Sequence, residues 1–315
     1  MLLLIKYTLL YSAVLTLVAL GGMFSERSGI INIALEGIMT IGGLVGIVMI
    51  NIMNNAGVPL AIGISVSILS AGVAGLIYST LLAFSAINLK ADQTIGGTAL
   101  NLLATAIAMV VAKRINGTDS PKLVYNTNRN LVLNNQHFTF KIAGLELNWF
   151  ILVCIVAVCA AWFILYRTRF GMRLMSCGEH PQAADSVGIN VYKMRWAGVM
   201  MSGVLGGIGG MAYIVPAVGD WNFEMGVAGM GFLALAVMIF GQWKPVNIAA
   251  AAIFFGFFRA LANIFDSFAF LKALDLQKEV YNIMPFLASM IVLALTSKSS
   301  RAPKAEGIPY DKGQR

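Results

Sequence analysis

Nine apolar runs, separated by polar stretches, make up most of this 315-residue chain. Most of them approach or exceed the ~20 residues that a helix needs to cross the ~30 Å hydrocarbon core of a bilayer. We therefore predict an all-α, polytopic transmembrane helical bundle with about nine apolar runs. The runs are Leu2–Phe24, Gly29–Ile52, Leu60–Ile87, Thr94–Ala112, Asn148–Tyr166, Trp196–Val218, Gly226–Phe240, Val246–Phe265 and Val280–Thr296.

Composition supports a membrane protein. Hydrophobic residues are 58% of the chain and charged residues 11%, which is too few polar residues to cover a water-facing globule. The basic residues lie in separated loops, so the net charge of +8 indicates topology and not a nucleic-acid partner. The first run, although it carries Lys6, is followed at once by another apolar run, and we expect it to be a retained membrane span.

Loop charges predict which segments lie inside. Loop 167–195 is basic at both ends, so the positive-inside rule places it in the cytoplasm. We expect residues 1–297 to form the transmembrane domain and 298–315 to form a cytoplasmic C-terminal tail. Loop 113–147 and the N-terminus are then extracytoplasmic, and the alternation in Phe138–Ile142 suggests a strand or hairpin there.

The middle of loop 167–195 carries residues that typically begin and end a helix. Pro181 suits the first position of a helix, and Gly188 suits the left-handed position that ends one. These residues predict a short helix, Pro181–Val187, outside the bilayer. Because a helix of under two turns is marginal alone in water, packing must hold it. Three interpretations are open. The helix lies on lipid headgroups, its residues belong to a plain loop, or the helix docks into a groove of a soluble partner.

The residues of this loop resemble a loop of a known protein family. Gly178–Asn190, preceded by Arg167–Gly171 and followed by a Ser- and Gly-rich span, is similar to the coupling loop of ABC-importer permeases of the branched-chain amino acid, ribose and nucleoside family. In that family the short helix sits in a cleft of the cytoplasmic ATPase and transmits its closure. The resemblance assigns ATPase coupling to Gly178, Glu179, Pro181, Ala183, Ala184, Asp185 and Gly188.

A second stretch places polar groups inside an apolar run. Asn32 and Glu36 are four residues apart and share one helical face. An acid within a span is unfavourable and usually faces a cavity or a partner. The pair either stabilises helix contacts or lines the translocation path, for which Asn32, Glu36 and Asn101 are the candidates. We predict that this face points into the bundle and that Glu36 finds a hydrogen-bond donor, either Asn101 or a backbone N–H beside a glycine.

Two stretches resemble the nucleoside arm of the family. Ser25–Met39 carries its Glu-Arg-Ser-Gly pattern followed by Asn-Ile and Glu-Gly, and Gly229–Pro245 ends in its Gly-x-Trp-x-Pro pattern. Just upstream of the latter, Asp220, Trp221 and Glu224 are either interfacial residues or contacts of the outer mouth with a binding protein or the entering ligand.

The glycines of the sixth run have two interpretations. Gly207–Ala212 matches a dinucleotide-binding fingerprint, but that motif needs a preceding strand and a soluble βαβ unit, so we exclude it. Their spacing instead forms small-x-x-x-small pairs that let helices approach closely. The glycines expected to pack helices are Gly203, Gly206, Gly207 and Gly210.

No catalytic or metal site is expected. The chain has no G-x-x-x-x-G-K-[ST] loop, so ATP and Mg²⁺ would be used by a separate subunit, and we expect no cofactor on this chain. Its two histidines lie in different loops. Cys154, Cys159 and Cys177 fit no disulfide or metal scheme and are expected to be buried small hydrophobes.

The resemblance implies a multi-pass permease subunit of the bacterial inner membrane. It would belong to an ATP-driven importer of a small polar solute, with nucleosides first and riboflavin or a simple sugar as alternatives. Its implied partners are an ABC ATPase, a solute-binding lipoprotein, membrane lipid and a second permease. Longer relatives have an extra N-terminal span that this chain lacks. Short members of the nucleoside arm commonly pair with a longer, different permease, so the resemblance favours a heterodimer over a homodimer. An ion-coupled secondary transporter is the alternative of another class, although we find no inverted repeat. A pure scaffold subunit is a third possible function.

Overall fold

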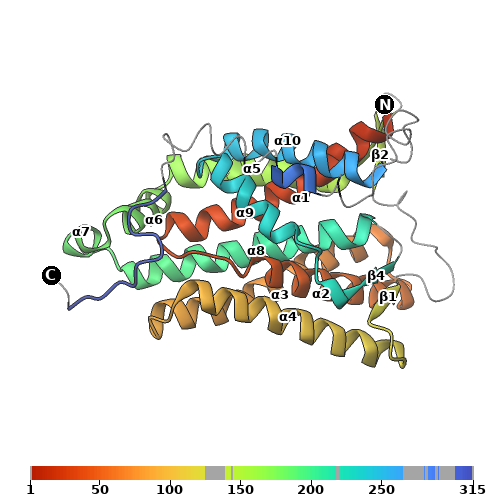
Figure 1. Cartoon of the computed structure of the whole chain (residues 1–315), viewed down its shortest axis with the longest axis horizontal. Coiled ribbons are helices and arrows are strands. Elements are labelled where there is room, and N and C mark those ends of the chain that lie inside the picture. Colours follow the sequence, from red (N-terminus) through yellow and green to blue (C-terminus); the bar gives the residue numbers. More distant parts are fainter. Residues whose placement is uncertain are drawn as a thin grey trace.

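The chain folds into an elongated bundle of helices (Figure 1). The structure is a computed structural model that describes residues 2–124, 139–142, 145–217, 220–264, 280, 283–287, 290 and 302–313. Its helices are α1 (Leu2–Arg27), α2 (Leu35–Asn55), α3 (Leu60–Ala83) with its π-helical extension η1 (Phe84–Asn88), α4 (Gln93–Asn116), α5 (Trp149–Arg167), α6 (Arg169–Glu179), α7 (Pro181–Ser186), α8 (Val191–Ala217), the 3-10 turn η3 (Phe223–Met225), α9 (Met230–Phe240) and α10 (Pro245–Ile264).

The predicted polytopic all-α fold is confirmed, but the predicted count of nine runs is not. Within the described residues, seven helices are long and apolar enough to cross a membrane, namely α1, α2, α3 with η1, α4, α5, α8 and α10. Helix α9 has 11 residues. It therefore rises about 16 Å, roughly half of the hydrocarbon thickness. Most of the run Val280–Thr296 lies outside the described residues.

Two short antiparallel pairs lie at one end of the bundle, which we call the β1 end. β1 (Lys122–Val124) pairs with β4 (Asp220–Asn222), and β2 (Thr139–Ile142) pairs with β3 (Leu145–Asn148). The predicted strand is thus confirmed over residues 139–142, while Phe138 lies outside the described residues.

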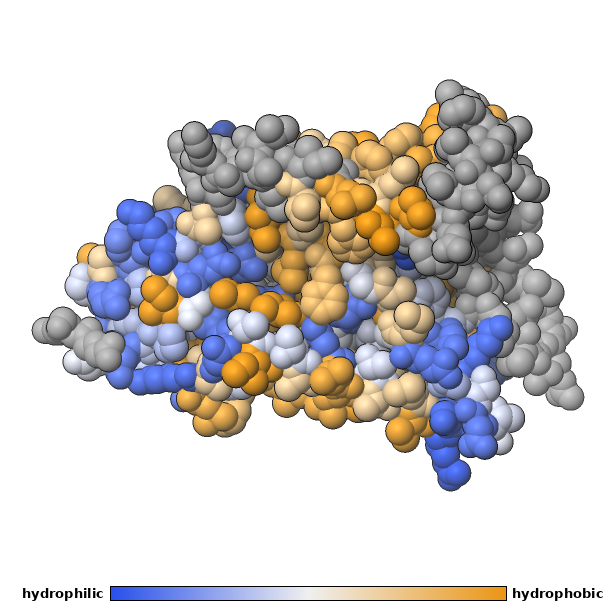
Figure 2. All heavy atoms as spheres, in the orientation of Figure 1, coloured by the Kyte–Doolittle hydropathy of each residue, from blue (hydrophilic) through white to orange (hydrophobic). Residues whose placement is uncertain are grey.

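Helix α7 and the chain's C-terminus lie at the opposite end, which we call the α7 end, and the N-terminus lies at the β1 end (Figure 1). The predicted topology requires this separation of loop 167–195 from loop 113–147. Apolar residues gather along the middle of the molecule, with hydrophilic residues towards both ends (Figure 2). The assignment of the α7 end to the cytoplasm stays a prediction.

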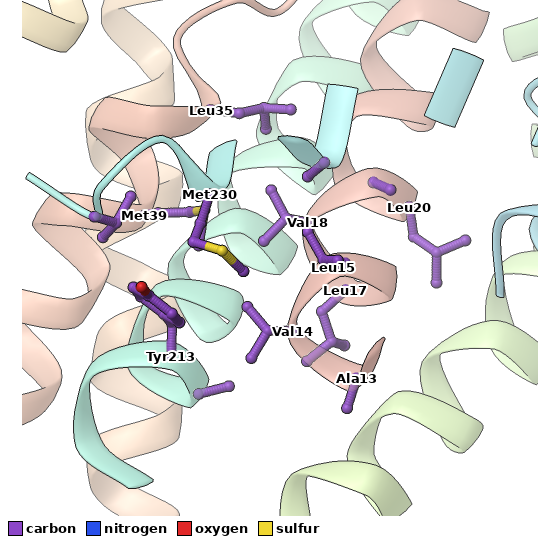
Figure 3. Close-up of a cluster of buried hydrophobic side chains, with 14 of the residues drawn as sticks. Ala13, Val14, Leu15, Leu17, Val18, Leu20, Leu35, Met39, Tyr213 and Met230 are labelled. Atoms are coloured by element: carbon purple, nitrogen blue, oxygen red, sulfur yellow. The ribbon is translucent and has the colours of Figure 1, made fainter. Parts of the chain in front are cut away.

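The core forms around α1. Every residue from Leu10 to Glu26 is buried, which is expected of a helix that is apolar on all sides. Figure 3 shows side chains of α1 packed with Leu35 and Met39 of α2, Tyr213 of α8 and Met230 of α9.

Helix α8 packs closely on α2 and α3 through glycines. A Cβ atom at Gly207 would overlap the carbonyl oxygen of Ala71, and one at Gly210 would overlap the carbonyl oxygen of Met39. Gly203 and Gly206 leave similar room for Ser79 and Ile38. All four glycines expected to pack helices therefore lie at helix contacts, where small residues let backbones approach.

Candidate translocation site and coupling region

Two helices of the bundle begin inside it. Segment 28–34, between α1 and α2, has no helix and runs back into the bundle beside α8. On the other side, residues 226–229 form a turn before α9, with Gly229 at φ +78°. Helix α2 then runs to the β1 end and α9 to the α7 end, so the N-termini of two interrupted helices meet within the protein (Figure 1).

The irregular backbone of segment 28–34 is satisfied by side chains from other helices. The side-chain oxygen of Gln93 accepts from Ile31 N (2.7 Å), and Asn101 Nδ2 donates to the carbonyl of Ile33 (3.0 Å). Asn32 Nδ2 donates to Ser202 Oγ (2.7 Å). Non-helical backbone at membrane depth is tolerated only where protein or a water-filled cavity satisfies it, and here protein does so.

Glu36 joins the two helix starts. Its Oε1 accepts from Gly229 N (2.8 Å) and its Oε2 from Gly231 N (2.7 Å). These are N–H groups at the N-terminus of α9, where no intrahelical acceptor exists and the helix dipole favours a negative charge. Gly231 is required because a Cβ there would lie 2.6 Å from Glu36 Cα. The prediction that Glu36 faces inwards and finds a backbone N–H beside a glycine is confirmed.

Asn101 of α4 caps the other helix. Its Oδ1 accepts from Gly37 N in the first turn of α2 (2.7 Å), while its amide group holds Ile33 as described above. Each interrupted helix is therefore capped by a side chain of a different helix. Asn101 was expected as a possible donor to Glu36, and it instead holds the backbone on either side of the break.

A cavity of about 810 Å³ lies beside this junction. Its volume is within the ~300–1,000 Å³ of small-molecule pockets. Glu36 and Asn101 line it, but Asn32 does not, because Asn32 is buried against α8. The other polar lining groups are Thr98, Thr105, Glu224 and Arg259, and the larger apolar ones are Leu102, Met225, Met230, Phe232, Leu233 and Phe286.

Several of these residues were missed from sequence, although signals existed. Thr98 and Thr105 flank Asn101 at helical spacing and so share its face. Arg259 lies within an apolar run, where a charge usually marks a functional interior. Its Nη2 donates to the hydroxyl of Tyr213 (3.3 Å).

The three residues expected at the outer mouth occupy different positions in the structure. Glu224 is exposed and lines the cavity. Trp221 instead supports the turn before α9, since its Nε1 donates to the carbonyl of Gly226 (3.0 Å) and its ring packs edge-on against Tyr213. Asp220 is the first residue of β4, and its side chain lies outside the described residues.

The short helix predicted in loop 167–195 is confirmed as α7, which ends one residue earlier than expected. Pro181 occupies its first turn, and Gly188 follows it at φ +82°. A second helix, α6, was not predicted. It begins after Thr168, whose Oγ1 accepts from Gly171 N (3.1 Å).

Burial divides the residues assigned to ATPase coupling. Ala183 and Gly188 are exposed, and Glu179 and Asp185 are partly buried, whereas Gly178, Pro181 and Ala184 are buried within this chain. Ala184, 3% exposed, therefore cannot form an outward contact. The most exposed large apolar residue of loop 167–195 is Val187, at 74%. The inward direction of Ala184 depends on packing partners that the local sequence does not specify.

The cysteines only partly match expectation. Cys154 and Cys177 are buried, but Cys159 is exposed on the flank of α5. Burial raises the pKa of the Cys177 thiol, which keeps it protonated and unreactive.

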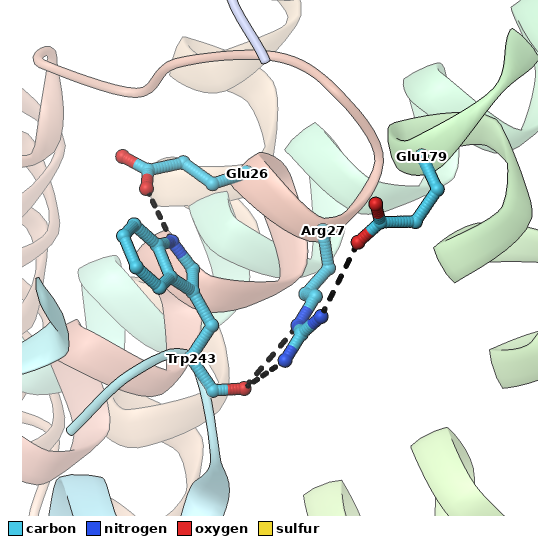
Figure 4. Close-up of polar contacts among 4 residues, drawn as sticks. All are labelled: Glu26, Arg27, Glu179 and Trp243. Atoms are coloured by element: carbon cyan, nitrogen blue, oxygen red, sulfur yellow. Dashed lines mark hydrogen bonds and ion pairs between the residues drawn. The ribbon is translucent and has the colours of Figure 1, made fainter. Parts of the chain in front are cut away.

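A polar cluster links the coupling region to the interrupted helices (Figure 4). Arg27, at the end of α1, donates twice to the carbonyl of Trp243 (3.1 and 3.3 Å) and lies 3.9 Å from Glu179. Trp243 Nε1 donates to Glu26 Oε2 (2.6 Å). Since Trp243 follows α9 and Glu179 precedes α7, Arg27 touches both the coupling region and the far end of the helix that Glu36 caps.

The similarity of this chain to known proteins extends over nearly its whole length. Residues 4–295 match the family described as the branched-chain amino acid transport system / permease component. The guanosine ABC transporter permease protein NupQ of Bacillus subtilis is 42% identical, over 98% of this chain and 96% of its own length. The nucleoside ABC transporter permease protein NupC of Lactococcus lactis is 38% identical, over 97% of this chain and 96% of its own length. A second protein of that organism, the nucleoside ABC transporter permease protein NupB, is 24% identical, over 44% of this chain and 38% of its own length. No solved structure matches the chain significantly.

Proposed function

The chain belongs to the permease family of branched-chain amino acid transport systems, and from this premise we propose that it is the membrane subunit of an ATP-driven importer of nucleosides. It is a multi-pass membrane protein. The proposal for nucleosides is supported by the two relatives named for guanosine and nucleoside transport, which match nearly the whole chain. The observation that carries it in the structure is the cavity at the junction of α2 and α9.

The cavity has the chemistry that a nucleoside requires. Phe232 and Phe286 offer aromatic surface to a base, and aromatic rings stack favourably on nucleobases. Thr98 and Thr105 offer hydroxyl groups, which both donate to and accept from ribose hydroxyls. Glu36 and Asn101 use their polar atoms to hold the helix starts, so we assign them to building the cavity floor and not to binding the base.

We assign closure of the path to a second permease subunit. Leu102 and Met225 line the cavity yet are largely exposed in this chain, so a further protein surface is needed to enclose a solute there. The two Lactococcus lactis relatives are both named as nucleoside permeases, which favours a heterodimer for this chain too. A solute-binding protein at the β1 end would deliver the nucleoside.

ATP hydrolysis belongs to a separate subunit that docks on α7. Closure of the ATPase subunit would displace α7. The displacement would pass through Glu179 and Arg27 to Trp243, which follows the end of α9. Because Glu36 accepts hydrogen bonds from the first N–H groups of α9 and lines the cavity, movement of α9 changes the cavity directly. Two discrete arrangements of this junction would correspond to outward- and inward-facing states.

Val187 is the residue whose replacement tests docking. We expect Val187→Asp to leave the chain folded, since the side chain is exposed, but to remove an apolar anchor and place a charge against the ATPase. An interface anchor contributes about 2 kcal/mol or more, so affinity should fall by about thirtyfold. The measurement is co-purification of the ATPase from detergent-solubilised membranes.

Asn190→Asp is the matched control. It adds the same charge three residues away and keeps an oxygen for the N–H of Lys193. The control should retain the ATPase. Equal retention by both variants would remove Val187 from the interface, and a wild-type chain that retains no ATPase would contradict the ATP-driven class.

A further inference from the structure

The C-terminal segment 302–313 is not a free tail but crosses the α7 end of the bundle, and we call it the tail strap (Figure 1). Two main-chain hydrogen bonds fasten it. Ala305 N donates to the carbonyl of Gly178 (2.8 Å), and Gly307 N donates to the carbonyl of Gly29 (3.2 Å). The strap therefore bridges the end of α6 and the start of segment 28–34.

A buried arginine fixes the middle of the strap. Arg195, in the first turns of α8, is almost entirely buried, and its Nη1 donates to the carbonyl of Ile308 (2.9 Å). A buried guanidinium group is strongly unfavourable without acceptors, so this carbonyl ties the strap to α8. Further along, Lys90 pairs with Asp311 at 2.8 Å and lowers the pKa of that carboxyl group.

Tyr310 is the side chain by which the strap holds the coupling helix. It is 4% exposed and packs with Cys177 of α6, Ala184 of α7 and Val191 of α8. Its ring meets Tyr192 edge-on at 5.3 Å between centroids. The inner face of α7 thus rests on a residue that lies 126 positions beyond Ala184 in the chain.

The strap connects α7 to segment 28–34, in addition to the routes through Arg27 and through Gly178 of α6, which lies beside Gly29. Helix α7 has six residues, too few to keep its shape without packing. Lys312 adds a 4.0 Å ion pair to Asp185. At the other end of the strap, Gly307 contacts Ile31 and Gly29. Segment 28–34 leads directly into Glu36.

We propose that Tyr310 is a positioning residue for energy coupling: it makes α7, the strap and segment 28–34 move as one body, so that displacement of α7 reaches the cavity floor. This inference rests on the proposed function. Without the Tyr310 ring, the ATPase still docks on the exposed face of α7, but α7 shifts against a gap and less of its movement reaches Glu36. ATP is then hydrolysed with less solute transported.

The test compares transport with hydrolysis in the same complex. The chain, its permease partner, the ATPase and the binding protein are reconstituted in liposomes, and tritiated guanosine uptake and phosphate release are both measured. Coupling between two sites typically amounts to about 5- to 150-fold, so Tyr310→Ala should lower the guanosine transported per ATP by roughly tenfold. Tyr310→Phe, which keeps the ring, should restore most of the ratio, and Lys304→Ala, on the exposed side of the strap, should not change it.

The outcomes separate the two proposals. If the wild-type complex imports guanosine and Tyr310→Ala keeps the wild-type ratio, the positioning role is wrong and the proposed function stands. If the wild-type complex imports no nucleoside, the proposed function itself is wrong. Should Tyr310→Ala fail to assemble, Tyr310→Val, which keeps some apolar volume but still leaves a gap beneath α7, is judged by the same ratio. A normal ratio there would equally overturn the inference.

Discussion

Replacing Glu36 by leucine should nearly abolish transport while leaving the chain in the membrane. The change orphans Gly229 N and Gly231 N in a buried junction. Each unsatisfied buried group costs about 1–3 kcal/mol, or about 2–6 kcal/mol for the pair. Since about 1.4 kcal/mol is a factor of ten in an equilibrium, the competent arrangement of α2 and α9 should become at least tenfold rarer. The measurement is uptake of tritiated guanosine by a transporter-deficient strain, normalised to the amount of chain in the membrane.

Glu36→Gln is the graded control. Its one carbonyl oxygen can accept one of the two bonds, while its amide group faces the other N–H as a donor. Uptake should therefore fall between wild type and Glu36→Leu. If Glu36→Leu transports normally at normal expression, the carboxylate does not hold the path and the cavity lies elsewhere.

A single added methyl group at Gly207 should strongly destabilise the whole bundle. In Gly207→Ala the new Cβ would overlap the carbonyl oxygen of Ala71 and approach Gly75 Cα at 3.1 Å. These are backbone atoms, so α8 must move away from α3. Overpacking typically costs about 1–3 kcal/mol, and here it also separates Gly207 from Gly42.

Gly96→Ala is the matched control. It makes the same substitution in a membrane helix, but its new Cβ has only Ser85 Oγ at 3.4 Å. Both variants share the gain of about 1 kcal/mol in helix propensity, so the difference between them reports packing alone. Thermal unfolding followed by size-exclusion chromatography in detergent should show a lower Tm for Gly207→Ala. Equal Tm values would mean that the α8 contact is looser than described.

Local sequence signals made part of this molecule predictable. Pro181 and Gly188 were enough to place α7, and the unfavourable position of Glu36 within an apolar run was enough to predict a buried donor. The polar face of α4 carried a comparable signal, although only Asn101 of that face was predicted. In each instance the determining signal lies within about one helical turn of the residue concerned.

The interruptions were not predictable by the same means. Gly29–Ile52 and Gly226–Phe240 read as continuous apolar runs, yet helices begin only at Leu35 and Met230. Hydropathy reports burial in lipid or protein and does not distinguish helix from non-helical backbone that other helices satisfy. The non-helical segment 28–34 is stabilised by Gln93, Asn101 and Ser202 from distant parts of the chain.

The tail strap escaped prediction for a related reason. Its composition is polar with Pro and Gly, which is typical of a solvated tail. What orders it is the buried guanidinium group of Arg195 and the apolar pocket for Tyr310, both built by other elements. The contact between Glu26 and Trp243, 217 positions apart, is likewise invisible to any local pattern.

The most direct test of the central claim is nucleoside uptake by proteoliposomes that contain this chain with its permease partner and ATPase, and the binding protein outside. We predict that tritiated guanosine accumulates only when ATP is enclosed, that unlabelled nucleosides compete while ribose and riboflavin do not, and that collapsing ion gradients with ionophores has no effect. Uptake that proceeds without the ATPase and disappears with the ion gradient would contradict the account.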